Sequence, residues 1–227
     1  MRHTPIGGIL FNAELVTTTD ILNLQYGFFT PHYFASRLFY PYTSITGKDW
    51  EVVHRNNSGI PNNPWKGEPS PELDAAWKSI WMIGDNTYSE DEIRKVGKDP
   101  AGVAQWPPEF GGGYVAKMEV FHQLHCLNTL RQALSPEYYG ADTPPRGHVV
   151  HCIEKLREAL MCFSDTTVKT YIWIEDSPNV QPDFSMRLHC RNFDEVREFS
   201  RRRAMTMEAQ KAMKKSDTNI IWPKLPD

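Results

Sequence analysis

An apolar stripe with helical spacing follows the loop that ends at Ser70. Ser70 suits an N-cap, Pro71 suits the first turn of a helix, and Gly84 is a stop signal. Between them the large apolar residues recur at i, i+4, i+7 and i+8, as Leu73, Trp77, Ile80 and Trp81. This spacing places all four on one side of a helix. We therefore predict a helix that starts at Pro71 and stops at Gly84, with its tryptophans in the core.

Three further helices are indicated by capping residues and apolar spacing. Ser89–Glu92 has the pattern of a capping box, which opens a short helix ending at Gly97. Two longer helices are predicted at 114–134 and 148–163, joined by a proline-containing connection at 135–147. Much of the apolar surface of the first is supplied by Leu124, Leu127, Leu130 and Leu134, and the core candidates of the second are Ile153, Leu156 and Leu160.

The two ends of the chain have weaker patterns. Residues 166–174 favour a strand, which Pro178 and Pro182 end. A last helix is predicted from Phe193 to Lys214, capped by Asn192, and the tail at 220–223 is expected to pack back on the body. The buried side of that helix is marked by Phe193, Val196, Phe199 and Met207. Residues 1–70 are aromatic and broken by Pro and Gly, so the apolar runs at 22–29 and 33–42 are strands or core-covering loops.

These patterns predict a mainly α fold with irregular loops and a few short strands. We expect one domain over 1–227, with a loop-rich part at 1–110, a core at 111–200 and a helix end with a tail at 201–227.

The composition is that of an ordinary globular protein. Of 227 residues, 40% are hydrophobic, and the formal net charge of −3 argues against a nucleic-acid partner. Arg201–Arg203 is the only dense positive run, and we interpret it as a solvated helix face. No run approaches the roughly 18 uninterrupted apolar residues of a membrane helix, and no secretory signal is visible. The glycosylation sequon Asn56–Ser58 is weak support for a secretory compartment.

The two longer helices carry the same five-residue motif. His122–Cys126 and His148–Cys152 both read His-x-x-His-Cys, and they start 26 residues apart. On a helix, positions i, i+3 and i+4 share one face, so each motif directs two imidazoles and one thiol to the same side. Two such faces turned towards each other predict a metal site between adjacent helices, with the ligands His122, His125, His148 and His151.

The connection between the motifs is long enough to bring them together. In a tight hairpin, His148 would lie near the end of the first helix. To bring it beside His122, the connection must run back along that helix for about eight to ten residues, or some 12–15 Å. The 13 residues at 135–147 span over about 40 Å when extended. We therefore expect His148 to return alongside His122.

The ligand type favours copper over zinc or iron. Neutral imidazole suits Zn, Cu, Fe and Ni, and the sequence lacks both the His-Glu-x-x-His of zinc proteases and the Cys-x-x-Cys of zinc fingers. A 2-His-1-carboxylate iron site would use one motif and leave the other without a role. A single His-x-x-His motif on a helix is, as often as not, a pair of hydrogen-bonded histidines with no ion. Two copies, which use four of the eight histidines, favour a metal.

The four cysteines are open to two roles. Cys126 and Cys152 are either thiolate ligands, which suit copper(I), or disulfide partners of each other or of Cys162 and Cys190. An oxidising compartment favours disulfides. Four cysteines allow three pairings, and their spacing does not select one.

The motifs resemble those of the fungal UstYa-like family, named for the ustiloxin oxidative cyclases. The resemblance covers roughly residues 112–199. Relatives tend to have histidine two residues before the position of Cys190, where this chain has Leu188. His189, next to the cysteine, is therefore only a secondary candidate ligand. The matching segments are Phe121–Asn128, His148–Ile153, Leu160–Cys162, Pro182–Phe184 and His189–Phe193.

The resemblance implies a copper-dependent tailoring enzyme of fungal secondary metabolism with one or two copper ions. Members are associated with oxidative macrocyclisation of ribosomal peptides, and relatives with hydroxylation, dehydrogenation or chlorination of small molecules. The expected partners are therefore a peptide or small-molecule natural product, O2 and, for halogenation, a halide. Members usually have the catalytic body in the secretory lumen on an N-terminal membrane anchor. We expect that location, although no anchor is visible in these 227 residues.

Our hypothesis is that the four histidines hold the copper that activates O2 beside a substrate C–H or O–H bond. Carboxylates near the motifs that would orient the imidazoles are Glu119, Glu154 and Asp165, although surface or capping roles are favoured for them. Candidate substrate contacts are Tyr138, Tyr139 and Trp173. The alternatives are a non-catalytic copper- or zinc-binding accessory protein and a zinc hydrolase, which the missing carboxylate beside the histidines disfavours.

Overall fold

The computed structural model describes residues 50–55 and 62–215. Contacts divide the chain into residues 1–40 and 41–227, and all described residues belong to the second unit. The apolar runs at 22–29 and 33–42, the sequon at 56–58 and the tail at 220–223 lie outside the described residues. The prediction of a single domain stays a prediction.

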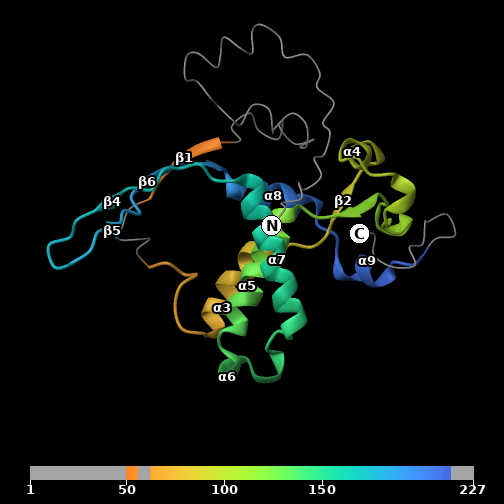
Figure 1. Ribbon diagram of the computed structural model, residues 1–227. Helices are drawn as coiled ribbons and strands as arrows, with labels where there is room; N and C mark the ends of the chain where they lie inside the picture. Colours follow the sequence, from red (N-terminus) through yellow and green to blue (C-terminus); the bar gives the residue numbers. More distant parts are fainter. Residues whose placement is uncertain (1–49, 56–61, 216–227) are drawn as a thin grey trace, which may run out of the picture. The chain divides into compact units, whose positions relative to one another are not determined.

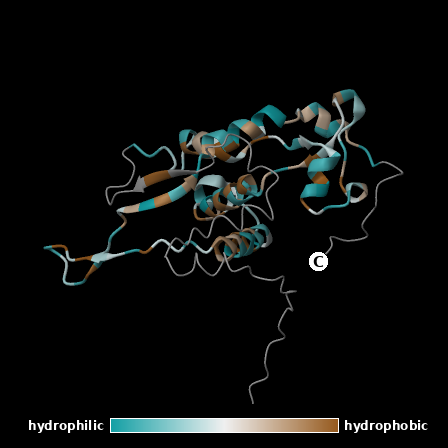
Figure 2. Cartoon of the chain, turned by 90° about the horizontal axis from the view of Figure 1, so that it is seen from above, coloured by the Kyte–Doolittle hydropathy of each residue, from teal (hydrophilic) through white to brown (hydrophobic). Residues whose placement is uncertain are grey.

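Helices dominate the described residues, which confirms the predicted mainly α fold. Helix α5 (Glu119–Ala133) packs on α3 (Pro71–Trp81) and on α7 (Arg146–Phe163), and the short α6 (Pro136–Tyr139) lies in the bend between α5 and α7 (Figure 1). Figure 2 shows hydrophobic and hydrophilic residues in succession along the helices. The other helices are α4 (Glu90–Lys95), α8 (Phe193–Arg203) and α9 (Met207–Ala212), with short 3-10 turns at Pro100–Gly102, Pro108–Phe110 and Gly140–Asp142.

The strands form three small antiparallel sheets of two strands each. The pairs are β1 (Trp50–Arg55) with β6 (Met186–Arg191), β2 (Asn86–Tyr88) with β3 (Tyr114–Ala116), and β4 (Tyr171–Ile172) with β5 (Gln181–Pro182). The strand predicted at 166–174 is thus only two residues long. Pro182, which was expected to end it, lies in the partner strand, where a proline is tolerated because each strand of a two-stranded sheet is an edge.

Capping residues set three helix starts as predicted. The Ser70 hydroxyl accepts a hydrogen bond from the backbone N–H of Leu73 at the start of α3. Ser89 and Glu92 form both halves of the capping box of α4. Asn192 caps α8 through its side-chain oxygen. These bonds span three residues, so their partners are visible in the local sequence.

Two helix boundaries differ from the prediction. Tyr114–Ala116 form β3 rather than the start of the motif helix, because Gly111–Gly113 all have positive φ and turn the chain into pairing with β2. The last predicted helix is broken into α8 and α9. At the break, the backbone N–H of Met205 donates to the carbonyl of Asp85 rather than continuing the helical pattern.

A polar hub lies in the core and connects β2 to α8. Asn86 is fully buried, and its amide nitrogen donates to the carbonyls of Gly84 and Ser200. The Ser200 hydroxyl donates to Asn86 Oδ1 over 2.9 Å, and the indole N–H of Trp106 donates to the Asn86 carbonyl. Every polar atom of the Asn86 side chain is therefore satisfied, as burial requires.

Several residues expected in the core are instead exposed. Helix α7 buries only Cys152, because it packs mainly on α5 through the face that carries its histidines and cysteine. Its apolar stripe lies about 100° around the helix from that face. The exposed residues are Leu127, Leu134, Ile153, Leu160 and Met207. Among the described helices, none is both long enough and apolar enough to cross a membrane.

Candidate metal centre

The four motif histidines come together between α5 and α7. Across the helices, the ring centroids of His125 and His148 are 5.4 Å apart, and those of His122 and His151 are 5.8 Å apart. Along each helix the separations are 6.5 Å and 6.4 Å. Each ring therefore has two others as neighbours. His148 returns beside His125 rather than beside His122 as predicted, because the connection retraces only part of α5.

The ring spacing is slightly wider than that of ligated imidazoles. A nitrogen about 2.0–2.1 Å from an ion puts its ring centroid about 3 Å away, so neighbouring ligand rings lie about 4.5–5.2 Å apart. The observed separations are larger, and within 50–55 and 62–215 no three His, Cys, Asp or Glu side chains are grouped closely enough to hold an ion as they stand. The donor types nevertheless fit copper, and an inward movement of about 1 Å by each ring would bring them to ligand spacing.

His125 has the electronic state that a metal ligand needs. Burial lowers its pKa, and the nearby His148, His122 and Lys117 lower it further, so the imidazole is neutral at physiological pH. Its Nδ1 is buried and has no hydrogen-bond partner among the described residues. A neutral imidazole donates a lone pair, whereas a protonated one does not.

Trp81, at the end of α3, packs on His125 with the ring centroids 4.7 Å apart. The contact closes the α3 side of His125 and limits the orientations of its ring. Sequence reasoning missed this role because Trp81 only completes a regular apolar stripe. The contact depends on how α3 packs on α5, and no local sequence signal reports it.

Glu119 fixes the orientation of His122. Its carboxylate oxygen Oε1 lies 3.0 Å from His122 Nδ1, and a proton placed on Nδ1 leaves Nε2 as an acceptor. His122 Nε2 lies 3.7 Å from Cys126 Sγ. The sequence favours a surface role for Glu119, and its side chain is indeed 62% exposed, yet it holds the imidazole.

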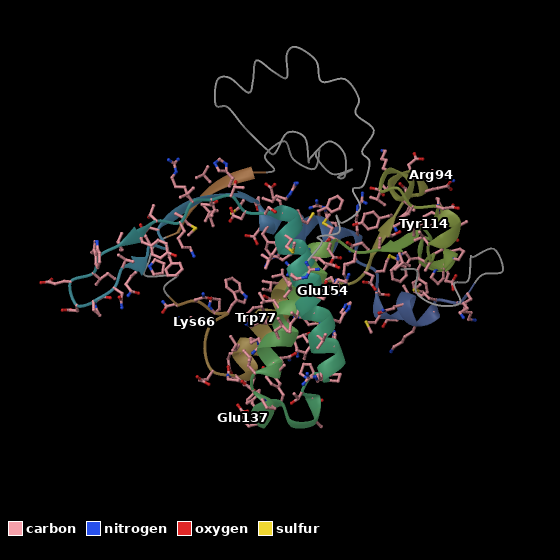
Figure 3. The ribbon with its side chains drawn as sticks, viewed as in Figure 1. Lys66, Trp77, Arg94, Tyr114, Glu137 and Glu154 are labelled. Carbon is pink, nitrogen blue, oxygen red and sulfur yellow. The ribbon has the colours of Figure 1, made fainter. Side chains whose placement is uncertain are left out.

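The other carboxylates considered from the sequence have other partners. Glu154 projects from α7 and pairs with Arg157 one turn away (Figure 3). The Asp165 side chain accepts a hydrogen bond from the backbone N–H of Thr167. The favoured surface and capping roles are therefore confirmed for these two residues.

The candidate aromatic contacts and His189 lie in other parts of the described chain. The Tyr139 hydroxyl donates to Asp74 over 2.7 Å. Tyr138 and Trp173 are exposed, and His189 is an exposed residue of β6 paired with Val52. None of them takes part in the ring contacts that join the four motif histidines.

All four cysteines are free thiols, so this structure holds none of the three disulfide pairings that the sequence allows. Cys126 and Cys152 are fully buried between α5 and α7, Cys190 is half-buried and Cys162 is exposed. Burial raises the pKa of Cys126 to about 12, with a further contribution from the Cys152 thiol. Cys126 is therefore a neutral thiol at physiological pH rather than a thiolate.

The fold and the site define a helical protein built around a paired His-x-x-His-Cys motif. The family model for the mycotoxin biosynthesis protein UstYa matches residues 19–203. The UstYa family oxidase phomYc of Diaporthe leptostromiformis is 32% identical over 172 residues, which cover 70% of this chain and 67% of the relative. The UstYa family oxidase aprY of Aspergillus flavus is 30% identical over 172 residues, or 69% of this chain and 52% of the relative. The chain belongs to the UstYa family of fungal mycotoxin-biosynthesis oxidases, as the motif resemblance predicts.

The relatives do not fix the reaction. The chain spans between about half and two thirds of the length of phomYc and aprY. A further relative, cctO of Talaromyces islandicus, is 31% identical over 157 residues, or 61% of this chain and 52% of the relative, and is named a transacylase. No solved structure matches the chain.

Proposed function

We propose that the protein is a copper-dependent oxidase that functionalises a C–H bond of a peptide or small-molecule natural product with O2. The observation that carries this proposal is the group of four imidazoles, two from each motif, each with two others as neighbours. Family membership supports the oxidase assignment. Oxidative cyclisation, dehydrogenation, hydroxylation and, with a halide, halogenation are the outcomes within this class.

His122, His125, His148 and His151 would hold one or two copper ions. Bound there, copper would supply one-electron chemistry with O2. The chain prepares two of these four ligands, each by a separate contact. Glu119 keeps the proton of His122 on Nδ1, and burial keeps His125 neutral beneath Trp81.

Substrate access is from the α7 side of the cluster. His148 and His151 are exposed, whereas His122 and His125 are half-buried. A hollow of about 290 Å³ is lined by residues of α3, α5 and α8 together with Trp65. Its lining residues are Trp65, Ile80, Val120, Leu124, Phe193, Asp194 and Arg197.

We also infer that the enzyme works in the secretory lumen, tethered by a membrane anchor as in the family it resembles. The support for this location is chemical. Cys126 and Cys152 are both buried on the helices that pack against each other, and a disulfide between them would suit an oxidising compartment.

The test compares His125→Ala and His151→Ala with His189→Ala, a matched control from β6. Copper content is measured by elemental analysis, and O2 consumption is measured with a candidate pathway intermediate, with and without chloride. We expect the first two variants to lose both copper and turnover and the control to keep both. Turnover retained by both motif variants would overturn the proposal. Copper bound by the wild type without O2 consumption would instead support the non-catalytic accessory protein.

A further inference from the structure

Helix α7 carries half of the histidine cluster and buries little of its own surface. Of its 18 residues only Cys152 is buried, and its main packing partner is α5. Cys152 is therefore the α7 side chain that lies deepest in the contact with α5. Metal sites tolerate ligand displacements of only a few tenths of an ångström, so a covalent link between α5 and α7 would help to hold the two histidine pairs at a fixed separation.

Cys152 meets its counterpart in the other motif. Cys126 and Cys152 are both fully buried, and they lie on α5 and α7, the two helices that pack against each other. They follow the two histidine pairs at the same motif position, and those pairs face each other. Cys162 is exposed at the end of α7, and Cys190 lies in β6. Of the three pairings that the sequence allows, the structure favours the one that contains Cys126 with Cys152.

We propose that Cys126 and Cys152 form a disulfide that joins α5 to α7 and frees the Nε2 lone pair of His122. Two thiols lose two protons and two electrons and form one S–S bond. The electrons pass to a low-molecular-weight disulfide such as oxidised glutathione, which is reduced to two thiols. Because the folded thiols are buried, the exchange occurs while the two helices assemble in an oxidising compartment.

The consequence for His122 follows from its two contacts. Glu119 holds the proton on Nδ1, so Nε2 is the acceptor for the S–H of Cys126, 3.7 Å away. A disulfide has no S–H, so the contact disappears and the lone pair becomes free to bind a metal. Only this use of the lone pair rests on the proposed function, since the disulfide itself requires neither copper nor turnover.

The disulfide is tested by peptide mapping of the wild-type chain from the yeast secretory pathway. The protein is denatured without reductant, alkylated with N-ethylmaleimide and digested with trypsin. Because trypsin cleaves after Lys and Arg, the four cysteines fall in separate peptides, at 118–131, 147–155, 158–169 and 188–191. We expect the first two to be linked. Alkylation of both Cys126 and Cys152, or linkage of either to another cysteine, would overturn the proposal.

A second measurement follows the His122 ring in metal-free protein. Long-range ¹H–¹⁵N NMR spectra are compared before and after reduction, with His189 as the reference ring. We expect reduction to shift His122 Nε2 away from the position of a free pyridine-type nitrogen, while His189 stays unchanged. Cys152→Ser should show no reduction-dependent shift, whereas Cys162→Ser should behave as wild type. An unmoved His122 resonance in the wild type would contradict the release of the lone pair.

Because both experiments are done without copper, they separate this inference from the proposed function. A linked pair in a protein that binds no copper would leave the disulfide standing and remove the oxidase proposal. Copper-dependent turnover in a protein with free Cys126 and Cys152 would leave the oxidase proposal standing and remove the disulfide.

Discussion

Replacing Asp74 with alanine should lower the free energy of unfolding by about 2–4 kcal/mol, because Asp74 connects three helices around the site. Its carboxylate, on α3, accepts hydrogen bonds from Arg131 of α5 over 2.5 Å and from the Tyr139 hydroxyl of α6 over 2.7 Å. The side chains of Asp74 and Arg131 are only 19% and 16% exposed. Water therefore replaces the lost partners poorly.

The magnitude follows from what the alanine leaves behind. Breaking a fully buried ion pair costs about 3–5 kcal/mol, and the residual exposure here reduces that range. Arg131 keeps its bonds to Asn128 Oδ1, which limits the loss, whereas the Tyr139 hydroxyl loses its acceptor. Asp74→Asn, which keeps the shape but removes the charge, should cost about half as much.

The assay is urea unfolding monitored by tryptophan fluorescence, since α3 contains Trp77 and Trp81. The midpoint should fall while the slope m stays constant, as for a loss of stability without a change in compactness. The control is Glu154→Gln, which breaks an exposed pair with Arg157 and should leave the midpoint unchanged. An Asp74→Ala midpoint indistinguishable from that of the control would refute the reasoning.

Three further predictions concern the site and its pH dependence. Glu119→Ala should weaken copper binding about 10–100-fold, because it removes the acceptor that orients His122. The affinity is measured by competition with a copper chelator, and an unchanged value would exclude a positioning role for Glu119. Trp81→Phe should keep the copper affinity, because it preserves a ring over His125. Trp81→Ala should reduce the affinity. Equal affinities in the two variants would show that the ring is unnecessary. Burial opposes ionisation of Asp74 and Glu92, but hydrogen bonds lower the pKa of both below the ordinary value. The two carboxylates therefore stabilise the fold fully above about pH 4, and this stabilisation is lost as the pH falls through their lowered pKa values in the folded protein. Urea midpoints should fall on acidification, and they should fall less steeply in Asp74→Asn, which lacks one of the two carboxylates.

The parts of the fold that sequence reasoning predicted are those set by local contacts. Ser70, Ser89 and Asn192 bond to backbone groups three residues away, so the cap and its partner lie in one short window. The pairing of the two motifs was also predictable, because helical spacing fixes which residues share a face. The partners across the helices, His122 with His151 and His125 with His148, depend on how far the connection retraces α5, and the sequence does not give that length.

The parts of the fold that sequence reasoning missed depend on contacts between segments that are distant in the sequence. Tyr114–Ala116 continue a helical pattern in the sequence, but their pairing with β2 makes them a strand. Ile153 and Leu160 have the spacing of a buried stripe, but α7 packs on α5 through a different face, and both are exposed. Trp81 came to the site only through the packing of α3 on α5.

The central claim is that imidazoles from both motifs bind the same copper. Electron paramagnetic resonance of the copper(II)-loaded protein, prepared with natural-abundance and with ¹⁵N-labelled histidine, tests it most directly. We predict nitrogen hyperfine splitting that changes with the label and that is altered by His125→Ala and by His151→Ala, but not by His189→Ala. A spectrum unchanged by either motif variant would contradict the account.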